Sequence, residues 1–134
     1  MAPVWATRDH VRGGVSEGQV GFPSWDRARV FRYEIRRWRG GIVPDAASAV
    51  DSPRRVSTSQ AQASQVLELV PLCPVLTWGR DELRTGEMWN SNSLTSWLLT
   101  ASGHDIGALR PPANGRAPGW VAGSVVAART RTEC

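Results

Sequence analysis

The chain has 134 residues, of which 41% are apolar and 21% are charged, a balance that fits one ordinary globular domain. It contains no apolar run near the ~20 residues that a membrane helix needs. Its start has no apolar signal core. We therefore expect a cytoplasmic protein. Cys73 and Cys134 cannot build a disulfide framework and form no CxxC pair, so we expect no structural disulfide, no metal and no cofactor.

The net charge of +4 has an unusual origin, because all 16 basic residues are arginine and lysine is absent. Lysine is normally among the commonest residues, so the composition indicates a bias of the source genome. Arginines chosen for phosphate contact cannot be separated from arginines that replaced lysine throughout. The arginine-rich composition and high pI are therefore weak evidence for a nucleic-acid partner.

The first half of the chain begins with a stretch that lacks sustained periodicity. We predict an irregular N-terminal arm over residues 1–27, a single α+β domain over 28–129 and a short tail over 130–134. Within the domain, alternation over residues 28–38 places Phe31, Tyr33 and Ile35 on one face. That period of two is typical of a half-buried strand.

A helix and a second strand are predicted next. Ser57, followed three residues later by Gln60, forms a capping-box pattern. Apolar residues at helical spacing then continue to Val70, and Pro71 ends the helix. Residues 72–78 read as a buried strand, and a charged loop follows over 79–87.

The best-specified element is a helix that begins at Asn90. Asn90 is a good N-cap, and an apolar stripe follows at positions i, i+3, i+4 and i+7. Gly103 supplies a natural C-terminal stop. A loop over 104–120 leads to a closing strand over 121–129. These elements predict an α+β fold in which a small mixed or antiparallel sheet packs with two main helices. The members of the apolar stripe are Leu94, Trp97, Leu98 and Ala101.

The polar start of this helix is the first candidate site. At a helix N-terminus the first N–H groups lack intrahelical partners and the dipole is positive. A nucleophile there gains stabilisation of its anion, and the neighbouring N–H groups can hold an oxyanion. Ser91 is the candidate nucleophile, with Asn90, Asn92 and Ser93 around it. The alternative is structural, because asparagine and serine are what any helix start prefers.

A serine nucleophile needs a base within hydrogen-bond reach, and the chain offers two histidines. His104 lies beyond the far end of the helix, and a rise of ~1.5 Å per residue places it roughly 20 Å from Ser91. His10 is therefore the remaining candidate base. The alternative is that His10 is an ordinary surface residue of the arm.

Arginines interleaved with aromatic residues suggest a second kind of site. Arg32, Arg36 and Arg39 fall in or beside the strand predicted over 28–38, where they could hold phosphates while aromatic rings stack on bases. Glu34 shares a face with Arg32 and Arg36, so the alternative is a solvated strand face with a local ion pair. Arg116 is a further candidate, because it could pair with a carboxylate or bind an anion.

Two segments carry a resemblance to known proteins. The stretch Gly86–Leu99 and the later Gly115–Trp120 resemble bacterial proteins of unassigned function and, distantly, circularly permuted papain-like domains. In that family a nucleophilic cysteine lies at a helix N-terminus within an Asn-Cys-Asn-Ser/Thr segment. The resemblance implies that Ser91 occupies the cysteine position and that Asn90, Asn92 and Ser93 match its neighbours. Without the thiol the nucleophile loses its easily formed anion.

The sequence thus leaves three hypotheses. The first is a papain-like hydrolase or a catalytically degenerate relative that binds rather than cleaves, with its site at Asn90–Ser93. The second is a small arginine-rich module for an anionic partner such as nucleic acid. The third is a structural or interaction protein, which would fit the seven tryptophans if several of them are exposed as one patch.

Overall fold

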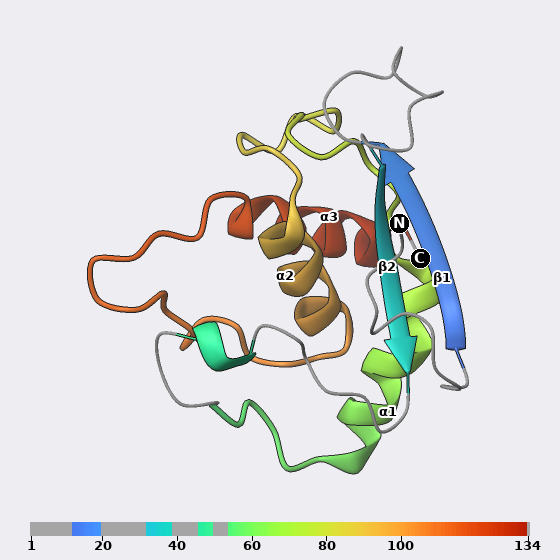
Figure 1. Ribbon diagram of the computed structural model, residues 1–134, viewed down its shortest axis with the longest axis vertical. Coiled ribbons are helices and arrows are strands. Elements are labelled where there is room, and N and C mark those ends of the chain that lie inside the picture. Colours follow the sequence, from blue (N-terminus) through green and yellow to red (C-terminus); the bar gives the residue numbers. More distant parts are fainter. Residues whose placement is uncertain (1–11, 20–31, 39–45, 50–53, 134) are drawn as a thin grey trace.

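The computed structural model describes residues 12–19, 32–38, 46–49 and 54–133. Three α-helices dominate this part of the chain, and a pair of strands lies beside them (Figure 1). The elements are β1 (Arg12–Gln19), β2 (Arg32–Trp38), the 3-10 turn η4 (Ala46–Ser48), α1 (Gln60–Leu69), the 3-10 turn η5 (Val70–Leu72), α2 (Ser91–Ala101) and α3 (Trp120–Thr132).

The α+β fold expected from the sequence, with a small sheet packed with two main helices, is wrong. The described residues are mainly helical, and their strand content is confined to the β1–β2 ribbon. Residues 72–78 form no strand, and the predicted closing strand over 121–129 lies inside α3. Tertiary packing explains the second error, since small side chains at helical spacing fit α3 against α2 and outweigh the β propensity of its valines.

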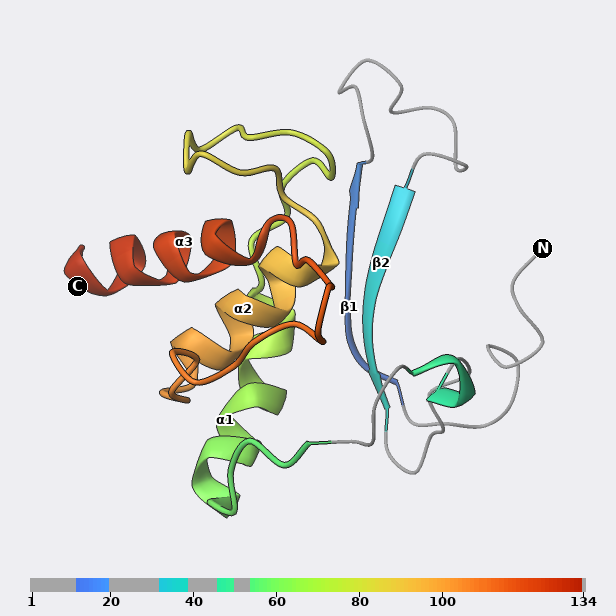
Figure 2. The same cartoon turned by 90° about the vertical axis from the view of Figure 1, so that its left-hand side faces the viewer.

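The β1–β2 ribbon is antiparallel and pairs Arg12 with Trp38 at one end and Gln19 with Arg32 at the other. A register shift lies between Gly13 and Val15, where a bulge adds twist to a ribbon. Figure 2 shows the ribbon standing beside the helical part of the molecule. Ile35 is buried and joins the core cluster, so β2 is tied to the helices through this residue.

Helix α1 confirms the helix predicted after Ser57, but its N-cap lies two residues later. The Ser59 hydroxyl accepts a hydrogen bond from the Gln62 backbone N–H, while the Ser57 hydroxyl donates to the Gln62 side chain. Pro71 falls within η5 directly after the helix, as expected of a residue that cannot continue the α-helical hydrogen bonds.

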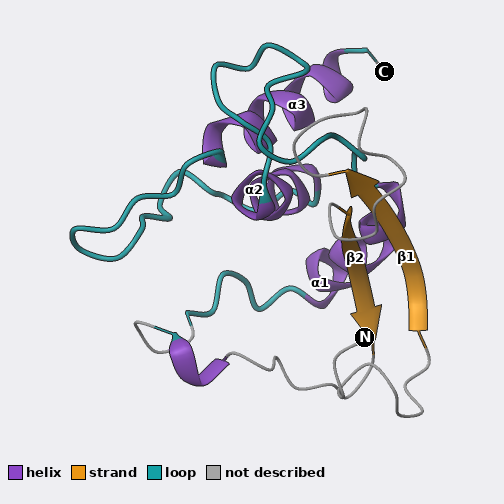
Figure 3. Ribbon diagram, turned by 45° about the horizontal axis from the view of Figure 1, so that its top comes forward, coloured by secondary structure: helices purple, strands orange, loops and turns teal. Residues whose placement is uncertain are grey.

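Helices α2 and α3 lie side by side and make the main helix–helix contact (Figure 3). They run in broadly the same direction (Figure 2). The start of α3 lies at the start of α2, and near its end Arg131 donates to the Thr100 carbonyl. A Cβ added at Gly123 would overlap the Ser93 carbonyl oxygen and lie 2.7 Å from the backbone nitrogen of Trp97. Glycine at this position therefore allows the two backbones to touch.

The core contains large aromatic residues beside small residues such as Ala122 and Ala127. Trp89 and Trp97 are 2% and 6% exposed. Leu94, Leu98 and Ala101 pack against the core, which confirms the predicted apolar face of α2. Within the described ranges, no helix combines the length and apolarity required to cross a membrane.

Candidate functional site

The candidate catalytic segment forms the capped N-terminus of α2. The Asn90 side-chain oxygen accepts from the backbone N–H groups of Asn92, at 2.9 Å, and Ser93, at 3.2 Å. In return the Ser93 hydroxyl accepts from the Asn90 backbone N–H at 3.0 Å. This reciprocal pair is a capping box, so Asn90 is the N-cap that the sequence predicted.

The same side chains also hold the chain that enters α3. The side-chain amides of Asn90 and Asn92 both donate to the Pro118 carbonyl, at 2.9 and 3.0 Å. Gly119 follows with φ of +86°, and a Cβ there would lie 2.7 Å from both the Asn90 amide oxygen and the Ser93 hydroxyl. Side chains of residues 87–93 therefore pack against the backbone of residues 118–121. We call these two segments the α2–α3 junction.

Glu87 completes the α2–α3 junction from the other side. Its carboxylate accepts from the Val121 backbone N–H at 3.0 Å, in the first turn of α3. A negative charge is favourable there because the N-terminus of a helix carries a partial positive charge. Glu87 thus replaces the side-chain cap that Gly119, the N-cap residue of α3, cannot provide.

Ser91 is exposed in the first helical position, and its hydroxyl has no hydrogen bond to any described residue. The N–H groups of Asn92 and Ser93, which could have held an oxyanion, already donate to the Asn90 side chain. Of the four polar residues in the segment, Asn90, Asn92 and Ser93 thus serve the fold. Only the Ser91 side chain remains available within this part of the structure.

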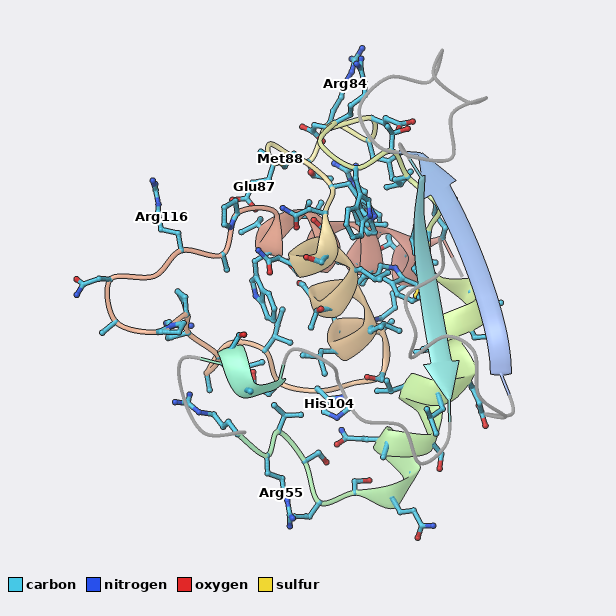
Figure 4. The ribbon with its side chains drawn as sticks, in the orientation of Figure 1. Arg55, Arg84, Glu87, Met88, His104 and Arg116 are labelled. Atoms are coloured by element: carbon cyan, nitrogen blue, oxygen red, sulfur yellow. The ribbon has the colours of Figure 1, made fainter. Side chains whose placement is uncertain are left out.

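The two histidines offer Ser91 no base within the described ranges. His104 lies past the C-terminus of α2, with its Nδ1 2.7 Å from the hydroxyl of Ser102, which is buried (Figure 4). His10 lies outside the described residues. The assignment of Ser91 as nucleophile and His10 as base stays a prediction.

The structure describes two of the three candidate arginines of the strand region. Arg39 lies outside the described residues, and the structure gives Arg32 and Arg36 as backbone positions of β2. In the register, Glu34 lies between these two arginines along β2 and faces Glu17 on β1. Two carboxylate-bearing positions therefore interrupt the proposed row of arginines.

Arg116 lies on the loop between α2 and α3, which extends away from the helices (Figures 1 and 4). Its side chain is exposed and its guanidinium has no hydrogen bond to any described residue. Arg110, on the same loop, instead donates to the carbonyls of Gly107 and Leu109. Arg116 is therefore free to contact a partner, whereas Arg110 stabilises its own loop.

Sequence reasoning missed the residues that join the two helices. Gly119 and Glu87 had no assigned role, although a Pro-Gly pair ahead of an apolar stretch was a possible signal of a helix start. Arg129 also escaped notice. Its guanidinium donates to the carbonyls of Leu83 and Arg84, and so fixes the 81–87 loop against α3.

Cys73 has the properties of a buried structural thiol. It is 4% exposed, and burial raises its pKa to about 12. A thiol with such a pKa is almost entirely protonated at neutral pH and is a poor nucleophile or metal ligand. Among the described residues, no group of histidine, cysteine, aspartate or glutamate side chains could hold a metal ion.

Comparison with known proteins gives no relative on which to build. No protein-family model, no curated protein and no solved structure matches the chain. These comparisons give no support to the resemblance to permuted papain-like domains.

Proposed function

We propose that this protein is a non-catalytic binding module for an anionic partner, with nucleic acid as the leading candidate and Arg116 as a contact residue. The observation that carries the proposal is the exposed guanidinium of Arg116, which has no hydrogen bond to any described residue and lies on a loop that extends from the helices (Figure 4). A delocalised guanidinium with its donors unoccupied is well suited to bind phosphate.

The sequence around Arg116 supports a positive local potential. No aspartate or glutamate occurs between Asp105 and Glu133, while four arginines do. Arg110 and Arg116 share the loop between α2 and α3, whereas the other two, Arg129 and Arg131, lie in the last turn of α3, roughly 13 Å or more along the helix from its start. That distance exceeds the Debye length of ~8 Å at physiological salt, so the positive potential near Arg116 comes from the two loop arginines.

Several of the described carboxylates accept hydrogen bonds from backbone N–H groups. Asp81 accepts from Thr85 and Gly86, Glu82 accepts from Thr77, and Glu87 caps α3. Asp105 likewise accepts from the Gly107 N–H. These acidic groups serve loops and helix ends, and none of these contacts brings a carboxylate to Arg116.

The experiment is a salt titration of binding to a fluorescent single-stranded oligonucleotide, read by anisotropy. Each phosphate contact contributes about 0.7 to the slope of log K against log salt for a single strand. Arg116→Gln should weaken binding and reduce the slope by about that amount. The proposal would be refuted if the wild-type protein does not bind at low salt, or if Arg116→Gln binds as tightly as the wild type.

Arg84→Asn is the matched control. Arg84 is exposed and lies on the 81–87 loop, away from Arg116 (Figure 4), and its φ of +52° is one that asparagine tolerates. Both variants lose one positive charge. If binding depended only on net charge, they would weaken it equally, whereas a site at Arg116 predicts a larger loss for Arg116→Gln.

The hydrolase hypothesis has its own test. A fluorophosphonate probe labels activated serines, and comparison with Ser91→Ala identifies labelling at Ser91. We expect no labelling above background, because the neighbouring N–H groups are already bonded to Asn90. Labelling that the mutation abolishes would instead identify a reactive serine and make His10 the first base to examine.

A further inference from the structure

The turn immediately before Arg116 carries an exposed Asn-Gly pair. Residues 112–115 form a tight turn in which the Gly115 N–H donates to the Pro112 carbonyl at 2.7 Å. Asn114 has φ of +62°, in the left-handed region where asparagine is tolerated better than most residues. Both Asn114 and Gly115 are exposed.

This turn requires glycine after the asparagine. A Cβ added at Gly115 would lie 2.9 Å from the Pro112 carbonyl oxygen and 3.4 Å from the proline ring, so a larger residue would strain the turn. The same lack of a Cβ leaves the Gly115 nitrogen sterically open to the side chain before it. The turn therefore places a reactive Asn-Gly pair at the surface.

We propose that Asn114 is a site of spontaneous deamidation and that the reaction places a negative charge beside Arg116. The Gly115 amide nitrogen loses its proton and attacks the Asn114 side-chain carbonyl carbon. Ammonia leaves and a five-membered succinimide forms. Water then opens the ring to aspartate or, through the other carbonyl, to isoaspartate. The step requires only water and base, and the hydrogen bond from Gly115 to Pro112 has to open first.

The other asparagines of the chain provide an internal comparison. Asn90 and Asn92 are each followed by serine and lie at the start of α2. Their side-chain amides donate to the Pro118 carbonyl and are held by these hydrogen bonds. The Asn114 side chain has no hydrogen bond to any described residue. We therefore expect reaction at Asn114 and protection at Asn90 and Asn92.

The consequence for binding rests on the proposed function. A carboxylate at position 114 would be two residues from Arg116, in a stretch that otherwise lacks acidic residues. It would offset part of the attraction for phosphate, and isoaspartate would also lengthen the backbone within the turn. Deamidation would thus lower the affinity of the module progressively as the protein ages.

The experiment incubates the folded full-length chain in mildly alkaline and mildly acidic buffer and follows it by tryptic peptide mapping. Because trypsin cuts poorly before proline, the peptide from Thr85 to Arg116 carries all three asparagines, and fragmentation assigns each one. We expect aspartate and isoaspartate to accumulate at Asn114, faster in alkali, while Asn90 and Asn92 keep their amides. Retention of the Asn114 amide to the same extent as the other two would overturn the proposal.

Two variants separate the modification from the binding function. Asn114→Gly keeps the positive φ without an amide and should show no mass gain in this peptide. Asn114→Asp carries the negative charge before any incubation and should bind the oligonucleotide more weakly than Asn114→Gly at low salt. If the wild type binds no oligonucleotide, the proposed function fails, while the mass measurement still decides whether Asn114 reacts.

Discussion

The contact between α2 and α3 makes an unusual prediction for Gly123→Ala. In an isolated helix this change is stabilising by about 1 kcal/mol, because alanine has the higher helix propensity. Here the new Cβ would overlap the Ser93 carbonyl oxygen and lie 2.7 Å from the backbone nitrogen of Trp97. Ordinary contacts of this kind begin near ~3.5 Å, so the helices would have to move apart.

The expected cost follows from these terms. Overpacking a closely packed core costs ~1–3 kcal/mol, and contact with backbone atoms that cannot rotate away belongs at the upper end. After the gain of about 1 kcal/mol in helix propensity, we expect Gly123→Ala to be destabilised by about 2 kcal/mol. With a urea m-value of about 2 kcal/mol/M, the midpoint of unfolding falls by about 1 M.

Urea unfolding followed by tryptophan fluorescence and far-UV circular dichroism measures this shift. Ala128→Gly is the matched control, because Ala128 is exposed on the same helix. Its substitution should lower the free energy of unfolding by about 1 kcal/mol through helix propensity alone. A Gly123→Ala protein as stable as the wild type, or more stable, would mean that the α2–α3 contact is not as described here.

Three further predictions concern the cap, the thiol and the loop carboxylate. Asn90→Ala should lower the free energy of unfolding by about 1–2 kcal/mol, measured by urea unfolding, since it removes the N-cap of α2. Asn90→Ser, which keeps an N-cap acceptor oxygen without placing a carboxylate against the Pro118 carbonyl, should lose less. In a Cys134→Ser protein, Cys73 should resist a thiol reagent at neutral pH until urea unfolds the chain, because burial raises its pKa to about 12; rapid labelling of this native protein would contradict the burial of Cys73. Hydrogen bonds from Thr85, chiefly its backbone N–H, hold the Asp81 pKa below its ordinary value. The stabilisation from this carboxylate is therefore complete above its unfolded pKa of about 3.9 and is lost as pH falls through the lower folded pKa. Asp81→Asn should flatten this acid dependence of the urea midpoint, and an unchanged pH profile would argue against the loop geometry.

The sequence by itself determined the elements whose signals are local. Helix α2 has its N-cap, its apolar stripe and Gly103 with φ of +80° within one short segment, so its bounds and buried face were predictable. Helix α1 was predictable for the same reason, apart from the choice between Ser57 and Ser59 as its cap. Capping bonds and helical periodicity depend on neighbours along the chain, and a sequence displays those directly.

Only the tertiary structure decided that residues 120–132 form a helix and which contacts the polar residues at the start of α2 make. The valines of residues 121–129 favour a strand, and the small residues Ala122, Gly123 and Ala127 favour a helix only once α2 is present to pack against them. The contacts that Asn92 and Ser93 make with Pro118 and Gly119 likewise could not be predicted from the sequence around them. Contacts between segments distant in sequence fix both outcomes, because the energy of close packing exceeds the small differences in local propensity.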